Sequence, residues 1–62
     1  MDPHDIEEVE VHDTGYQTVT VYFWLKDGTE VIKAMDCITA RVMLNVYAGM
    51  YGWHAYWHHD YE

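Results

Sequence analysis

Cysteine, long apolar runs and basic residues are all scarce in this sequence. Cys37 is the only cysteine among 62 residues, so an internal disulfide is excluded. A lone thiol is typical of a reducing compartment. No segment approaches the roughly 20 apolar residues of a membrane span. The acidic residues 1–10 resemble neither a secretory signal nor a transit peptide, and we therefore expect a cytoplasmic protein.

The scarcity of basic residues limits the kind of partner. Three Lys and Arg residues stand against eleven Asp and Glu residues, and the formal net charge is -8 at pH 7. Six of the acids lie within the first thirteen residues, where there is no Lys or Arg. Such a surface repels nucleic acid and anionic membranes and attracts basic proteins over a Debye length. The alternative reason for so many acids is solubility alone.

Hydrophobic periodicity predicts an α+β fold. Three segments alternate apolar and polar residues, as half-buried strands do, a hairpin turn leads into a fourth strand, and one segment has apolar residues at helical spacing. The predicted strands span residues 7–12, 16–26, 29–35 and 53–61, and the predicted helix spans residues 37–48. The order β-β-β-α-β predicts a three- to four-stranded antiparallel sheet with one helix on one face. We expect a single domain over residues 1–62, with residues 1–5 as a loose acidic tail.

The turn between the second and third strands decides which residues face the core. Asp27-Gly28 is typical of a two-residue type I′ hairpin. With that turn, Phe23 lies opposite Ile32 on the core face, and Tyr22 lies opposite Lys33 on the outer face. The expected core contains Val19, Val21, Phe23, Leu25, Ile32, Leu44 and Tyr47.

Apolar area is abundant for so short a chain. Six Tyr, three Trp and one Phe are present, and each aromatic side chain buries about 150–250 Å² when it packs. The predicted helix is also apolar on nearly all sides, which predicts cover on more than one side. We therefore expect part of this area to lie at a partner interface or in a homodimer.

The residues that suggest metal binding lack enough further ligands, and the residue that suggests catalysis lacks a base. His54, His58, His59 and Asp60 are zinc-ligand types, but on a strand His54 and His58 are about 13 Å apart, too far for one ion. A structural zinc needs four ligands and a catalytic zinc needs three. Cys37 has no histidine near it in sequence to act as a base. We predict no enzyme, no metal and no cofactor.

The spacing of the acids suggests mimicry of nucleic acid. Alternate residues of a strand stand about 6.8 Å apart on one face, of the same order as successive phosphates. Glu8 and Glu10 have this spacing, and Asp60 and Glu62 repeat it. Such rows fit a basic groove meant for DNA or RNA, and the alternative is a solvated sheet edge whose charges block aggregation. Direct nucleic-acid binding is not expected, because three basic residues cannot replace the condensed counterions.

We predict a partner-binding surface in which aromatic anchors sit within a charged rim, as interface hot spots often do. The partner would be a basic nucleic-acid-binding protein. The predicted surface contains Glu7, Glu8, Glu10, Asp13, Tyr22, Trp24, Tyr56, Asp60 and Glu62.

In size, charge and element order the whole chain resembles small acidic phage-encoded inhibitors of bacterial nucleic-acid enzymes. Three groups are similar: anti-CRISPR proteins, inhibitors of uracil-DNA glycosylase and inhibitors of RNA polymerase, several of which imitate nucleic-acid charge. The Glu-Ser-Asp-Glu-Ser stretch of one glycosylase-inhibitor family is absent. We favour the anti-CRISPR group because its sequences are the most varied. The resemblance implies an inhibitor in the cytoplasm of a bacterial host, and the alternative is a structural or oligomerising module that is acidic only for solubility.

Overall fold

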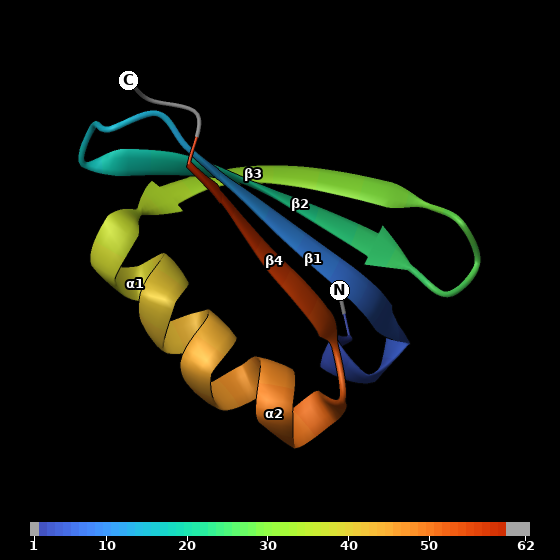
Figure 1. Ribbon diagram of the computed structural model, residues 1–62. Coiled ribbons are helices and arrows are strands. Elements are labelled where there is room, and N and C mark those ends of the chain that lie inside the picture. The colour runs from blue at the N-terminus through green and yellow to red at the C-terminus, as the bar shows by residue number, and fades with distance from the viewer. Residues whose placement is uncertain (1, 60–62) are drawn as a thin grey trace.

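A computed structural model describes residues 2–59 as a four-stranded sheet with a helical segment against one face (Figure 1). The α+β prediction is therefore confirmed. The strands are β1 (Ile6–Asp13), β2 (Thr18–Leu25), β3 (Glu30–Asp36) and β4 (His54–His59). The helical elements are a short 3₁₀ helix η1 (Pro3–Asp5), helix α1 (Cys37–Val42), a π-helical turn η2 (Met43–Tyr47) and helix α2 (Ala48–Tyr51).

The sheet is mixed, with the strand order β3-β2-β1-β4. β1 pairs antiparallel with β2, and β2 pairs antiparallel with β3, but β4 pairs parallel with β1. The prediction of a wholly antiparallel sheet is wrong at this one pair. The reason is the helical connection between β3 and β4, which crosses one face of the sheet. After such a crossover β4 runs in the same direction as β3, and β3 runs in the same direction as β1. β1 consequently lies inside the sheet.

The turn between β2 and β3 is longer by one residue than predicted. The Leu25 N–H donates to the carbonyl of Thr29 at 2.8 Å, and the Gly28 N–H donates to the carbonyl of Leu25 at 3.0 Å. The loop therefore contains residues 26–28, and Gly28 adopts φ of 91°. A three-residue hairpin with glycine in the left-handed region is a common alternative to the two-residue turn.

This longer turn shifts the register of β3 by one residue. Phe23 pairs with Val31, and Tyr22 pairs with Ile32. A one-residue shift moves every side chain of a strand to the other face. Ile32, which we expected in the core, is therefore on the outer face and is 55% exposed, while Lys33 is not on that face.

The core lies between the sheet and the helical segment. Its buried apolar residues are Ile6, Val9, Val11, Val19, Val21, Phe23, Ala40, Met43, Ala48 and Trp53. The predictions for Val19, Val21 and Phe23 are confirmed, and Leu25 and Leu44 are partly buried against this core. Tyr47 is 47% exposed, so its prediction is wrong. Tyr47 is the last residue of the π turn η2. A π turn contains more residues than an α-helical turn, so residues at its end no longer lie on the face that a 3.6-residue period predicts.

A polar cap begins the helical segment, and a glycine ends it. The Asp36 carboxylate accepts from the Thr39 N–H at 2.9 Å, which confirms the predicted N-cap. Hydrogen bonds from the Thr39 hydroxyl and N–H lower the pKa of Asp36 from its ordinary value. Gly52, with φ of 72°, ends the segment after Tyr51. No helix in residues 2–59 is long and apolar enough to cross a membrane.

Candidate functional site

The sheet surface that faces away from the helical segment carries three rows of four side chains, one from each strand. Strand alternation selects these residues, and the strand register aligns them. We call this set the outer face. Read from β3 to β4, its rows are Glu30, Trp24, Glu8 and His54; then Ile32, Tyr22, Glu10 and Tyr56; then Ala34, Thr20, His12 and His58.

Five of the predicted partner-binding residues share this outer face. In the first row Glu8 stands between Trp24 and His54. In the second row Glu10 stands between Tyr22 and Tyr56, and Tyr56 is 49% exposed. Both carboxylates belong to the inner strand β1, and each is flanked by an aromatic residue on at least one neighbouring strand. The structure thus brings together acids and aromatic anchors that the sequence placed on three separate segments.

Glu7 lies at the rim of this arrangement. The pairing of β1 with β2 shifts between Ile6 and Glu8, so Glu7 falls at an irregularity that interrupts strict alternation. Glu7 is exposed and helps to line a shallow hollow of about 330 Å³ with Glu8, Trp24, His54 and Tyr56. The indole N–H of Trp24 is buried and has no acceptor among residues 2–59, which is uncommon for a buried donor.

Asp13 does not belong to the outer face. Its side chain points toward the helical side, and the residue is only 5% exposed. One carboxylate oxygen accepts from the Trp57 indole N–H at 3.2 Å, and the other accepts from the Gly15 N–H at 2.9 Å. Asp13 therefore holds the end of β1 against β4 and the following turn, and its burial does not suit the predicted contact with a partner. The other two predicted acids, Asp60 and Glu62, lie outside the described residues.

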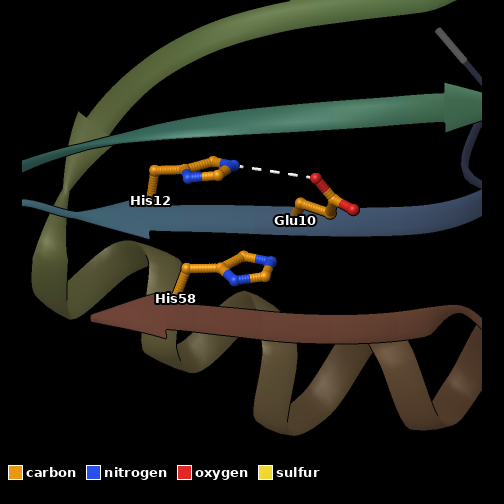
Figure 2. Close-up of side chains that lie close together, drawn as sticks. All are labelled: Glu10, His12 and His58. Atoms are coloured by element: carbon orange, nitrogen blue, oxygen red, sulfur yellow. Dashed lines mark ion pairs between the residues drawn. The ribbon is translucent and has the colours of Figure 1, made fainter. Parts of the chain in front are cut away.

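Sequence reasoning missed a cluster of metal-ligand side chains at one end of the outer face. Glu10, His12 and His58 project from β1 and β4 on one side of the sheet, and the helical segment lies behind it (Figure 2). Their candidate ligand atoms all lie within 4.8 Å of one another. His54 and His58 belong to one strand, whereas this cluster joins two strands that lie far apart in the sequence. The available signal was the alternate spacing of Glu10 and His12.

The cluster also has contacts of its own. His12 Nε2 lies 3.6 Å from a carboxylate oxygen of Glu10. The rings of His12 and His58 are stacked, with centroids 4.8 Å apart and planes 13° from parallel. The Tyr22 ring meets His12 edge-on at a centroid distance of 4.9 Å. These contacts hold His12 in the middle of the group.

The helical segment presents a second, apolar surface. Ile38, Val42, Val46 and Met50 recur at four-residue spacing and are 75%, 54%, 46% and 65% exposed, respectively. A groove of about 410 Å³ is lined by Ile38 and Val42 of this stripe and by Phe23 of the sheet. Residues 2–59 thus leave one apolar side of this segment uncovered, although the sequence predicts that it is covered on more than one side. Exposed apolar surface of this kind often marks an interaction site.

The chemistry of the outer face suits the recognition of basic side chains. Carboxylates form charge-assisted hydrogen bonds with Lys and Arg, and aromatic rings accept cations on their faces. Glu8 and Glu10 supply the first kind of group, and Trp24, Tyr22 and Tyr56 supply the second. Comparisons of the chain with protein-family models, with curated proteins and with solved structures found no match.

Proposed function

We propose that this protein is an inhibitory binding protein whose outer face occupies the basic DNA- or RNA-binding site of a partner. The observation that supports it most strongly is the position of Glu8 and Glu10 on β1, an inner strand of the sheet. Charged residues on an edge strand are explained by protection against aggregation. That explanation does not apply to β1, whose backbone is paired on both sides.

The inner position also favours binding. Glu8 and Glu10 stand at alternate positions of a strand held between β2 and β4, so their Cα atoms are fixed relative to each other before a partner arrives. Preorganised groups lose less conformational entropy on binding than groups on a loose loop. Their expected separation of about 6.8 Å is of the same order as that between successive phosphates. The aromatic neighbours on β2 and β4 supply apolar contacts around this charge.

The partner that best fits this surface is a basic nucleic-acid-binding protein of a bacterial host. We infer an anti-CRISPR-like inhibitor, because the chain is small, strongly acidic and α+β. A uracil-DNA glycosylase or an RNA polymerase is the alternative target. All three targets bind nucleic acid through basic surfaces, so one competition assay applied to each of them ranks the three.

The test measures whether the protein displaces nucleic acid from a CRISPR effector complex, a uracil-DNA glycosylase and an RNA polymerase. The decisive variant is Glu8→Gln with Glu10→Gln, which removes two charges from the outer face. The matched control is Asp5→Asn with Asp27→Asn, which removes two charges from acids that line one hollow near the β2–β3 loop. We expect displacement from one target by wild type and by the control, and at least about tenfold weaker displacement by the decisive variant. Equal displacement of nucleic acid by wild type, the control and the decisive variant would contradict the role of the outer face.

A second candidate function is an oligomerising module in which two copies meet through their helical surfaces. The sequence of residues 37–51 contains no Asp or Glu and one Arg. Two copies of a chain with net charge -8 can therefore meet there without bringing acids together. This candidate gains support if wild type displaces nucleic acid from none of the targets.

Sedimentation of variants tests this second candidate. Val42→Lys places a charge on the exposed helical surface, and Ile32→Lys places the same charge on the outer face, where Ile32 is similarly exposed. A dimer through the helical surfaces predicts a dimeric wild type, a monomeric Val42→Lys variant and a dimeric Ile32→Lys variant. A monomeric wild type at high concentration would exclude it.

A further inference from the structure

We propose that Glu10, His12 and His58 bind one divalent transition-metal ion of the zinc class. The proposal rests on the convergence of these three side chains, of which only Glu10 also belongs to the acids of the proposed inhibition. It replaces our expectation, drawn from the separation of His54 and His58, that the chain binds no metal.

The backbone places the three residues at the corners of a small triangle. His12 lies directly opposite His58 in the parallel pair of β1 and β4, and Glu10 precedes His12 by two residues on β1. Neighbouring strands are about 4.8 Å apart, and alternate residues of one strand are about 6.8 Å apart on the same face. Side chains of this length standing at such corners reach a common point above the sheet.

One distance in the cluster is already close to that of a tetrahedral site. Two ligand atoms that each lie about 2.0–2.1 Å from a tetrahedral zinc ion are about 3.3 Å from each other. His12 Nε2 and the Glu10 oxygen are 3.6 Å apart, and all the candidate ligand atoms lie within 4.8 Å of one another. Small rotations of exposed or half-buried side chains therefore suffice to close the site.

The ligand types select the class of metal. Two imidazoles and one carboxylate match a ligand set of catalytic zinc sites, in which the fourth position is left for water or substrate. Calcium and magnesium prefer ligand sets made of oxygen atoms, whereas imidazole favours zinc, copper and nickel. His58 is exposed, and Glu10 and His12 are half-buried, so a bound ion would keep an open position toward solvent.

Neighbouring residues support the orientation of the ligands. The Tyr22 and His12 rings pack in an edge-to-face arrangement, and His12 stacks on His58. Both contacts keep the two imidazoles next to each other, and chelation requires the stacked rings to turn so that their nitrogens converge. Residues that hold metal ligands in place contribute strongly to metal affinity in known sites.

The proposal is tested by titrating the whole chain with Zn²⁺ in a calorimeter and with Co²⁺ by visible absorption. We expect one ion per chain, release of protons on binding, and visible bands of tetrahedral or five-coordinate Co²⁺. His58→Gln and Glu10→Gln should each weaken Zn²⁺ binding at least about tenfold. The matched control is His54→Gln, which removes an exposed histidine from the same strand and the same face, and it should bind Zn²⁺ as wild type does.

Two results would overturn the proposal. One is the absence of one-to-one Zn²⁺ binding by wild type at micromolar protein concentration, and the other is loss of binding by His54→Gln as large as that by His58→Gln. Far-UV circular dichroism of each variant confirms that the sheet is intact. Because His58→Gln leaves Glu8 and Glu10 in place, loss of metal binding in this variant is distinguishable from loss of partner inhibition.

Discussion

Glu8 and Asp13 are acids of the same strand, but they lie on opposite faces of the sheet because strand residues alternate. Glu8 stands on the outer face beside Trp24. Asp13 is buried on the helical side, where it accepts hydrogen bonds from Trp57 and Gly15. Composition and spacing marked both as partner-binding acids. Their different environments follow from this alternation, but the predicted strand ends at residue 12, so alternation was not applied to Asp13.

The buried role of Asp13 predicts a loss of stability on mutation. Asp13→Ala leaves the half-buried indole N–H of Trp57 without its acceptor, and it also removes the contact that orders the turn at Gly15. We expect the free energy of unfolding to fall by about 1–3 kcal/mol. Urea denaturation followed by tryptophan fluorescence measures it, with Glu8→Gln as the control that should change stability little. An Asp13→Ala variant as stable as wild type would show that these contacts contribute nothing.

At the scale of elements, the sequence predicted the strands and the helix start better than their pairing. Alternation in β1 and β2 and the cap at Asp36 are local signals, and the structure agrees with each. The register of β3 depends on the number of residues in one turn, and Asp27-Gly28 is compatible with two turn lengths. The strand that pairs with β4 depends on the path of the helical crossover, which the alternation of apolar and polar residues does not predict. The cluster of Glu10, His12 and His58 was missed for that last reason.

The observed register of β2 and β3 makes a prediction about two apolar residues. Phe23 is 3% exposed and Ile32 is 55% exposed, although a two-residue turn would place both in the core. Phe23→Ala should lower the free energy of unfolding by about 3–5 kcal/mol, because it leaves a cavity. Ile32→Ala should change it by no more than about 0.5 kcal/mol, as exposed substitutions usually do. Denaturation curves of the two variants check this, and a comparably large loss in both would support the two-residue turn instead.

At the scale of the whole molecule, the outer face and the helical segment differ in their acidic residues. The outer face carries the carboxylates of Glu8, Glu10 and Glu30. The helical segment carries no acid and exposes an apolar stripe. A chain with net charge -8 that was acidic only for solubility has no need to concentrate carboxylates among aromatic residues in the middle of a sheet. This separation adds support to the proposal that the outer face recognises a basic partner.

The most direct test of this assignment is the salt dependence of inhibition by wild type and by the Glu8→Gln, Glu10→Gln double variant. Once a target is identified by competition, the inhibition constant of each protein is measured at low and at high salt. At 0.1 M salt, the interaction between exposed charges decays over about 10 Å, and it decays faster as salt rises. We therefore predict a large difference between the inhibition constants of the two proteins at low salt and a much smaller difference at high salt. A double variant that inhibits as strongly as wild type at low salt would contradict the central claim.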